Sequence, residues 1–140
     1  MTRVVKVKSG SPFEERESYS RLVVIGEWIL VSNTAGRNYR TQEMAPDAVG
    51  QIRQALENVK GALESVGSSL EDVVRSRVTI PHVEDAPDVM AVVGEYFRGI
   101  DPASTVTCSP LGGPDYRAEI EVTAFRGAGA FETERLQIVL

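Results

Sequence analysis

The stretch QIRQALENVKGALESVGSSLEDVVRSRVTI, residues 51–80, decides the fold class. Its first half repeats apolar residues at spacings of three and four, which predicts a helix from about Pro46 to Val66. Pro46 suits the first turn of that helix, and Gly67 suits a left-handed stop. The second half, VVRSRVTI, is rich in β-branched residues and predicts a strand. A sheet must lie beneath the helix to cover its apolar stripe.

The same patterns recur on both sides of this stretch. A second helix is predicted from about Pro87 to Arg98, with a stop at Gly99. The other strand candidates are RVVKVK (3–8), RLVVIGEWILVS (21–32, a hairpin that turns near Gly26 and Glu27), STVTCS (104–109) and RAEIEVTAF (117–125). The segment SGSPFEERESYS (9–20) is predicted to be a polar loop. The order β-β-β-α-β-α-β-β predicts an α+β fold with a mixed, mainly antiparallel sheet and two helices on one face.

Side chains alternate along these strands, so each strand has an apolar side and a polar side. On the last strand the polar side is formed by Arg117, Glu119, Glu121 and Thr123. On residues 73–80, the residues Val74, Val78 and Ile80 oppose Arg75, Arg77 and Thr79. We expect the helices to cover the apolar side. The polar side is either solvated, with Arg75 and Arg77 paired across strands to the two glutamates, or covered by another subunit.

The composition limits the classes of function. With 140 residues, of which 42% are hydrophobic, the chain has the size of one globular domain. A formal charge of −5 and scattered basic residues argue against nucleic-acid binding. One cysteine and one histidine give neither an intrachain disulfide nor a metal site, and nothing calls for a cofactor. Neither a signal peptide nor a membrane span is recognised, so we expect a soluble, cytoplasmic protein.

Four segments resemble the successive blocks of a known family. They are YSRLVVIGEWILVSNTAG (19–36), QIRQALENVKGALESVGSSLEDVVRSRVTI (51–80), DPAST (101–105) and AEIEVTA (118–124). Their order and spacing resemble the RidA/YjgF family, formerly also called the endoribonuclease L-PSP family, from about Phe13 to Arg126. The resemblance implies a chorismate-mutase-like α+β domain of residues 1–126. It also implies a homotrimer, with the polar sheet faces toward its centre and small-molecule clefts between neighbouring subunits.

In the active branch of that family, an arginine in a PARS-type motif binds the carboxylate of a 2-imino or enamino acid, and water hydrolyses the imine to a keto acid and ammonia. A guanidinium suits this role because its planar fork makes two charge-assisted hydrogen bonds to a carboxylate. Here the motif reads Pro102-Ala103-Ser104-Thr105, with Ser104 at the arginine's position. Loss of each charge-assisted hydrogen bond weakens ligand binding by about 1.5–3 kcal/mol. The resemblance thus implies that the usual clamp is missing, with Ser104 as a candidate ligand contact.

Four further positions match the family's cleft, and Cys108 is a fifth candidate because of its place on a strand. Glu119 matches a glutamate that positions ligand or water, which makes it the candidate catalytic residue, or it forms a structural ion pair. Tyr19 matches a tyrosine near the cleft, or it is a packing aromatic. Asn33 and Thr34 stand in the loop whose backbone lines the cleft, with Asn33 where the family has a glycine. Cys108, on the strand face of the motif serine, lines the pocket or is an inert small hydrophobe.

A different arginine could replace the missing clamp. Arg117 precedes the candidate glutamate on its strand, and Arg77 lies on a probable neighbouring strand. Arg37 and Arg40 lie in the loop GRNYRTQEMAP, where Tyr39 and Arg40 are the most interesting because the loop could fold over a neighbour's cleft. For each arginine the alternative is a solvated or ion-paired surface charge.

Three functions therefore compete. The chain is a small-molecule cleft protein that does not act as a standard 2-imino acid deaminase, or it is an imine or enamine deaminase with a relocated arginine. The third function, a ribonuclease, rests only on the older family label, and the acidic charge argues against it. The serine of the PARS-type motif favours the first.

The tail GAGAFETERLQIVL, residues 127–140, extends past the last family block. Its LQIVL ending is apolar and β-prone, and exposure of such a segment to solvent is unfavourable. We therefore expect residues 127–140 to pack on the sheet edge of their own chain or on a neighbouring subunit.

Overall fold

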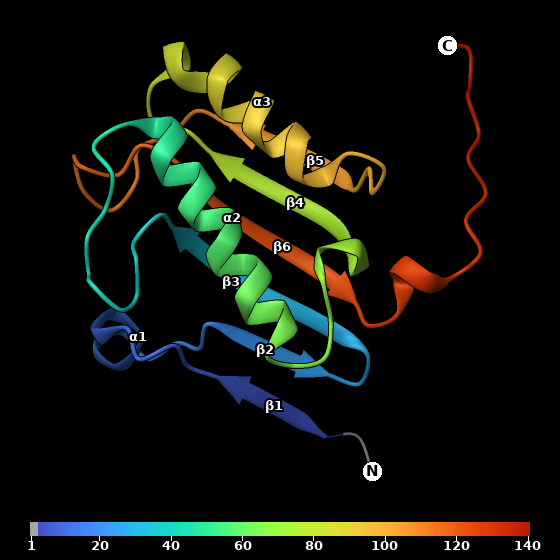
Figure 1. Ribbon diagram of the computed structural model, residues 1–140, viewed down its shortest axis with the longest axis horizontal. Helices are drawn as coiled ribbons and strands as arrows, with labels where there is room; N and C mark the ends of the chain where they lie inside the picture. The colour runs from blue at the N-terminus through green and yellow to red at the C-terminus, as the bar shows by residue number, and fades with distance from the viewer. Residues whose placement is uncertain (1–2) are drawn as a thin grey trace.

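The computed structural model describes residues 3–140, and its strands form one six-stranded sheet (Figure 1). The strands are β1 (Val4–Val7), β2 (Leu22–Ile25), β3 (Trp28–Ala35), β4 (Val73–Thr79), β5 (Ala103–Thr107) and β6 (Glu119–Phe125). They lie in the order β1-β2-β3-β6-β4-β5. Neighbouring strands are antiparallel except β4 and β5, which run parallel. The mixed, mainly antiparallel sheet predicted from the sequence is confirmed.

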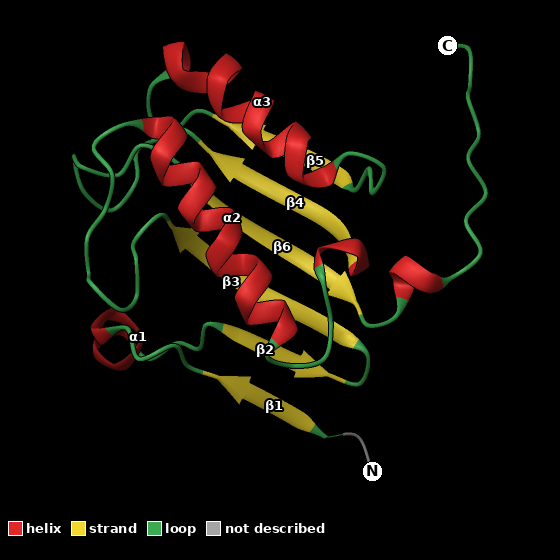
Figure 2. Cartoon of the chain, in the orientation of Figure 1, coloured by secondary structure: helices red, strands yellow, loops and turns green. Residues whose placement is uncertain are grey.

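Two long helices, α2 (Ala48–Glu64) and α3 (Ala86–Phe97), cover one face of the sheet (Figure 2). Asp47 caps α2 by accepting the N–H of Gly50, and Gly67 after the helix has a φ of +77°. Both helices begin and end within two residues of their predicted bounds. Short 3₁₀ turns stand at Leu70–Asp72, Val83–Asp85 and Ala128–Ala130. Within residues 3–140, no helix has the length and apolar character needed to cross a bilayer.

A short helix, α1 (Pro12–Glu17), stands where a polar loop was predicted. The Ser11 hydroxyl caps it by accepting the N–H of Phe13 at 3.3 Å, and a proline fills its first turn. Glu14 is fully buried and accepts hydrogen bonds from both the backbone and the hydroxyl of Ser9. With six residues and one large apolar side chain, α1 is too short for its periodicity to be recognised.

The core lies between the helices and the sheet, and α2 contributes most to it. From this helix Ile52, Leu56, Val59 and Leu63 are fully buried. Beneath them α2 packs across β3 and β6, and it packs sideways against α3. The buried side chains of α3 are Val89, Val92, Val93 and Phe97. Burial of each large apolar side chain contributes on the order of 1.5–3 kcal/mol before entropy is counted, so the two predicted helical stripes account for much of the stability.

A β-bulge changes which valine of β4 is buried. The register of β4 against β6 shifts between Val73 and Arg75, so Val73 is buried and Val74 is 38% exposed. The prediction that Val74 lies on the apolar side is wrong for this reason. Val78 and Ile80 are buried, as predicted.

The polar side of β4 and β6 forms the sheet face without helices. Arg77 lies opposite Glu121, with 3.9 Å between Nη1 and Oε1, so one predicted cross-strand pair is present. Arg75 instead donates to the Thr105 hydroxyl on β5 at 2.7 Å. Glu119 lies opposite a threonine of β4 rather than an arginine. The second predicted pair, between Arg75 and Glu119, is therefore not formed.

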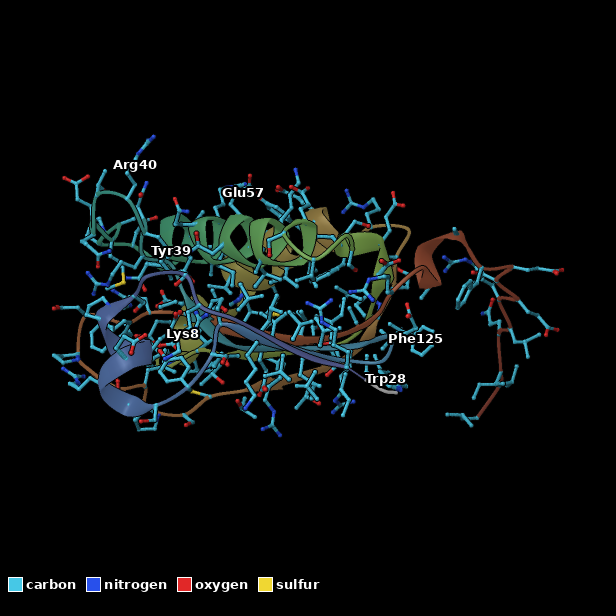
Figure 3. The ribbon with its side chains drawn as sticks, turned by 90° about the horizontal axis from the view of Figure 1, so that it is seen from below. Lys8, Trp28, Tyr39, Arg40, Glu57 and Phe125 are labelled. Carbon is cyan, nitrogen blue, oxygen red and sulfur yellow. The ribbon has the colours of Figure 1, made fainter. Side chains whose placement is uncertain are left out.

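The other half of the helix-free face is apolar. Its large side chains are Val4, Ile25, Trp28, Leu30 and Phe125, which we call the open apolar patch. The first four are each 45–49% exposed. The Trp28 and Phe125 rings meet edge to face, with centroids 4.9 Å apart. Figure 3 shows the two long helices on one side of the sheet and these two rings near its far end. Clustered exposed apolar side chains are typical of an interaction surface.

The tail is anchored at two points and then leaves the sheet. The Phe131 ring lies 6.0 Å from that of Phe125. Arg135 donates to the Asp101 carboxylate at 2.6 Å and to the Gly99 carbonyl at 2.7 Å. Beyond this anchor the chain runs outward (Figure 1), and its large apolar side chains, Leu136, Ile138, Val139 and Leu140, are at least 72% exposed. Residues 136–140 thus do not pack on their own sheet edge, and packing on a neighbour stays a prediction.

The end of β3 passes so close to α2 that only glycine fits at one position. A Cβ on Gly36 would collide with the backbone carbonyl of Gln51, whereas a Cβ on Gly61, inside α2, meets open space. We expect Gly36→Ala to lower the free energy of unfolding by about 1–3 kcal/mol or more through overpacking. The control Gly61→Ala should raise it by roughly 0.5–1 kcal/mol because alanine favours the helix. Urea denaturation measures both, and a Gly36→Ala protein as stable as the unmodified chain would contradict this packing.

Candidate functional site

A pocket of about 270 Å³ opens at the end of the sheet where β3 stops and β6 starts. Its main polar lining is Tyr19, Arg21, Asn33, Arg37, Tyr116 and Glu119. These residues come from the segment between α1 and β2, from β3 and β6, and from the two long loops that follow β3 and precede β6. The volume suits a small metabolite rather than a polymer.

Glu119 gives this pocket a carboxyl group of altered acidity. It is the first residue of β6, it is half-buried, and its Oε1 accepts a hydrogen bond from Asn33 Nδ2 at 2.9 Å. Desolvation by burial raises the pKa of Glu119, and the nearby charge of Arg21 opposes this to a smaller extent. The group stays protonated to a higher pH than an ordinary glutamate, which suits a role in proton transfer.

A buried ion pair lies behind this carboxyl group. Arg21 Nε is 3.4 Å from Glu14 Oε2, with the two side chains 7% and 0% exposed. The same guanidinium donates to the Tyr39 hydroxyl at 3.0 Å and to Thr34 Oγ1 at 3.3 Å. Its carbon lies 5.6 Å from the centroid of the Tyr19 ring. The pair therefore fixes two tyrosines of the pocket wall while its own charges cancel.

The carboxamide of Gln51 on α2 ties two loops together. This side chain is fully buried. Its Nε2 donates to the carbonyls of Ala45 at 2.9 Å and Asp115 at 2.8 Å, and its Oε1 accepts the Arg117 N–H at 2.7 Å. Ala45 belongs to the loop after β3, and the other two residues belong to the loop before β6. One side chain thus sets the relative position of both loops.

A second amide of α2 fixes the loop residue that faces the pocket. Asn58 Nδ2 donates to the carbonyls of Ala35 at 3.2 Å and Arg37 at 2.8 Å. The Arg37 side chain reaches Tyr116 on the other loop, with its Cζ 5.9 Å from the ring centroid and Nη2 3.5 Å from the hydroxyl. Arg37 and Tyr116 together form one wall of the pocket.

The pocket brings together three of the site residues expected from the sequence: Tyr19, Asn33 and Glu119. Thr34 does not line it, because it is fully buried and its hydroxyl accepts from Arg21. Cys108 does not line it either. The exposed thiol of Cys108 lies 3.5 Å from the carbonyl oxygen of Pro81.

Ser104 does not reach the pocket of its own chain. Glu119 lies opposite Thr79, which lies opposite Thr107, so these three residues share the helix-free face. Ser104 precedes Thr107 by three residues and is paired with the buried Ser76, so it lies on the other face. Since β4 also separates β5 from β6, only a neighbouring subunit could bring a serine of this kind to Glu119.

Arg40, Arg77 and Arg117 were the main candidates to replace the missing arginine, and none of them lines the pocket. Arg117 Nη2 is 2.6 Å from the Asp85 carboxylate, Arg77 is paired with Glu121, and Arg40 stands outside the lining. The guanidinium groups that do line it belong to Arg16, Arg21 and Arg37. Sequence reasoning missed Arg16 because it lies in a helix that was predicted to be a loop, and it missed Arg21 because this residue was assigned only to the start of a strand. The position of Arg21 two residues after the cleft tyrosine was the available signal.

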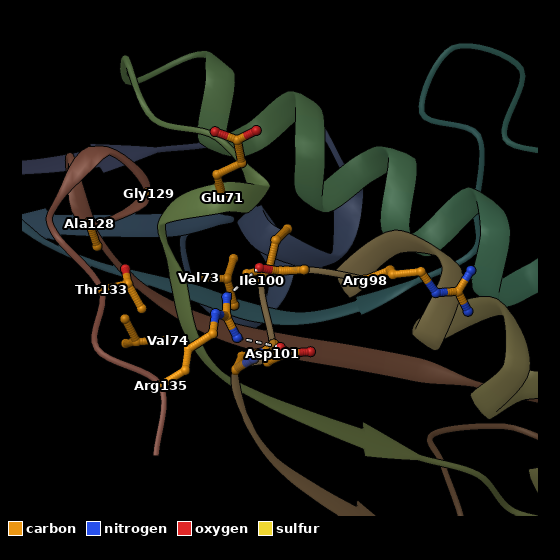
Figure 4. A pocket seen from close by; sticks show the side chains of 12 residues that line it. Glu71, Val73, Val74, Arg98, Ile100, Asp101, Ala128, Gly129, Thr133 and Arg135 are labelled. Carbon is orange, nitrogen blue, oxygen red and sulfur yellow. Dashed lines mark hydrogen bonds and ion pairs between the residues drawn. The ribbon is translucent and has the colours of Figure 1, made fainter. Parts of the chain in front are cut away.

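A larger pocket, of about 540 Å³, lies at the opposite end of the sheet (Figure 4). It is bounded by the start of β4, the approach to β5 and the tail, and Figure 4 shows Arg135 bound to Asp101 within it. That ion pair already neutralises two of the charges in its lining. The first pocket is therefore the better candidate for chemistry, because it combines a carboxyl group of raised pKa with several donors.

Comparison with known proteins agrees with this arrangement. A family model described as endoribonuclease L-PSP matches residues 10–126. The chain belongs to this family, which is the RidA/YjgF family. The 2-iminobutanoate/2-iminopropanoate deaminase of Dermatophagoides farinae is 34% identical over 105 residues, covering 74% of this chain and 81% of that relative. The deaminase of the same name from Escherichia coli K12 is 30% identical over 111 residues, covering 77% and 87%.

Among solved structures, a YjgF/YER057c/UK114 family member from Mycobacterium tuberculosis matches with a TM-score of 0.80 and 32% identity. The match covers 88% of this chain and 99% of that one. A structure described as a putative endoribonuclease from Thermotoga maritima matches with a TM-score of 0.75 and 28% identity, covering 86% of this chain and 91% of that one. The chorismate-mutase-like α+β fold predicted from the sequence is confirmed.

The raised pKa of Glu119 predicts how a substitution changes stability with pH. A carboxyl group whose pKa is raised by folding destabilises the folded state where it is ionised and not where it is protonated. Glu119→Gln removes the charge and keeps an oxygen that can accept from Asn33. We expect equal stability of the two proteins below about pH 4 and a growing advantage of the variant as pH rises through the folded pKa.

Urea denaturation at several pH values measures this difference. The matched control is Glu121→Gln, two residues along the same strand, which removes the partner of Arg77 and should give no such gain. If Glu119→Gln becomes less stable than the unmodified chain as the pH rises, the raised pKa assigned to Glu119 is contradicted.

Proposed function

We propose that this RidA/YjgF-family chain hydrolyses the C=N bond of a small imine, or of the imine in equilibrium with an enamine, with Glu119 as the proton-transferring group. The observation that carries the proposal is the half-buried Glu119 carboxyl group, whose raised pKa and Asn33 hydrogen bond lie in a metabolite-sized pocket. Relatives that match about three quarters of the chain are named 2-iminobutanoate/2-iminopropanoate deaminase, which supports the same chemistry.

The reaction needs one group that first gives and then takes a proton. Protonated Glu119 donates to the imine nitrogen, water adds to the imine carbon, and the carboxylate takes a proton from that water. The resulting carbinolamine nitrogen then receives the proton from Glu119, the C–N bond breaks, and the carbinolamine hydroxyl returns its proton to the carboxylate. The products are a carbonyl compound and ammonia, and the carboxyl group ends as it began.

A second candidate is a cleft that binds such molecules without turning them over. The observation in its favour is Ser104, which stands where the family's carboxylate-binding arginine is expected. A serine hydroxyl supplies one donor and no charge, so a carboxylate substrate would be held less firmly through this position.

Release of ammonia and keto acid from enzymatically generated 2-aminoacrylate and other imino acids separates the two candidates. We expect the unmodified chain to exceed a buffer blank and Glu119→Gln to lose about 10²–10⁴-fold in rate, with Glu121→Gln as the control. Turnover that survives Glu119→Gln would overturn the role of this carboxyl group. If the unmodified chain matches the blank while Ser104→Arg gains activity, the binding-only function is the correct one.

We also propose that the chain is a homotrimer whose subunits meet at the helix-free sheet faces, with the pockets between them and the tail packed on a neighbour. The open apolar patch and the exposed residues 136–140 support this, because burial of both would remove large apolar side chains from water. Because β5 is an edge strand and Ser104 is exposed, an assembly in which this edge also contacts the neighbour would place Ser104 near that neighbour's pocket.

Light scattering after size exclusion tests the assembly. We expect a mass three times that of the 15.3 kDa chain. Leu30→Lys, in the patch, should dissociate it, and Val83→Lys, at an exposed valine on a 3₁₀ turn, should not. Deletion of residues 131–140 should weaken the trimer, and an unchanged trimer after this deletion would contradict the role of the tail.

A further inference from the structure

Three guanidinium groups line the pocket, and two of them are already neutralised. Arg16 pairs with Glu17 at 3.3 Å, and Arg21 pairs with the buried Glu14 at 3.4 Å. Arg37 differs, because within residues 3–140 no carboxylate lies within ion-pair distance of it. Its acceptors are two neutral groups. Among the described residues, the pocket lining therefore contains one half-buried cation that has no ion-pair partner.

The hydrogen-bonding capacity of Arg37 is also only partly used. Its Nη1 donates to the Gln42 carbonyl at 2.8 Å and its Nη2 donates to the Tyr116 hydroxyl at 3.5 Å. A guanidinium carries five N–H donors, so most of them have no partner in the described chain. Unused donors on a cation are the groups that a carboxylate ligand requires.

The loop that carries Arg37 is held in place before any ligand arrives. A bridge pairs Arg37 with Met44, and the turn between them is closed by Asn38, whose side chain accepts from the N–H groups of Arg40 and Thr41. The Asn58 amide of α2 holds the Arg37 carbonyl, as described above. A cation fixed in this way loses little conformational entropy when it binds an anion.

We propose that Arg37 binds the carboxylate of the ligand and so replaces the clamp that Ser104 cannot provide. The inference rests on the proposed function, since it takes the pocket with Glu119 to be the place where a small molecule binds. It adds the anchoring residue: the carboxylate is held by the loop after β3 rather than by β5. The C=N carbon of such a ligand then lies toward Glu119, which lines the same pocket.

Binding of pyruvate to the full chain tests this without relying on turnover. Pyruvate represents the keto acids that imine hydrolysis would release, and methyl pyruvate is the same molecule without the negative charge. Titrations followed by NMR give both dissociation constants. We expect Arg37→Gln to weaken pyruvate binding by tenfold or more, as loss of a charged hydrogen bond predicts, and to leave methyl pyruvate binding nearly unchanged. Arg37→Lys, which keeps the charge and loses the fork, should lie between.

The matched control is Arg40→Gln, three residues along the same loop and outside the pocket lining, which should bind pyruvate as the unmodified chain does. Thermal unfolding of each variant shows that it is folded. Pyruvate binding unaffected by Arg37→Gln, or lost equally in Arg40→Gln, overturns the proposal. Absence of pyruvate binding to the unmodified chain overturns it as well. Ammonia release tests the proposed function separately. If the unmodified chain releases ammonia but one of these binding results overturns the role of Arg37, Glu119 keeps its proposed role and another residue must bind the carboxylate.

Discussion

The buried carboxamide of Gln51 is the contact on which the pocket depends. Its three hydrogen bonds satisfy backbone groups of two loops that share no secondary structure with each other. Removal of this amide would leave those part-buried groups without these partners, at a cost of up to about 1–3 kcal/mol each. Gly36 also lies so close to the Gln51 backbone that only a glycine fits there. A side chain at this position would push β3 away from α2. The helix therefore serves as the reference to which both pocket loops are fixed.

Once the loops are fixed, the charges of the pocket divide into two groups. Arg21 and Glu14 neutralise each other behind the wall, where they orient Tyr19 and Tyr39. Glu119 and Arg37, in contrast, face the cavity with their charges uncompensated by ion pairs. Burial makes ionisation of Glu119 unfavourable, and Arg37 has no carboxylate of the described chain within ion-pair distance. Such a pair of unsatisfied groups stabilises a bound ligand at the expense of the empty protein, which is common in binding sites.

Local patterns were sufficient to predict the layers of the fold but not the walls of the pocket. The apolar stripe of α2 and the alternation of β6 report burial directly, because each depends on residues a few positions apart. The α1 helix has too few residues for a period, and the bulge at Val74 depends on the register with another strand. The pocket depends on contacts such as that from Gln51 to Arg117, 66 positions apart. Family resemblance supplied Tyr19 and Glu119, whereas Arg37 gained its significance only from its neighbours in space.

The position of β6 has a consequence for the synthesis of the chain. This strand is the last of the six in sequence, yet it lies in the middle of the sheet and joins the β1–β3 half to the β4–β5 half. At the usual 5–20 residues per second, the roughly 80 residues between β3 and β6 delay that junction by about 4–16 s. From the completion of α2 until β6 is made, the apolar stripe of α2 has only part of its sheet to cover it. Until β6 is in place, native stability cannot protect this stripe, and exposed apolar surface of this kind makes an incomplete chain prone to aggregate.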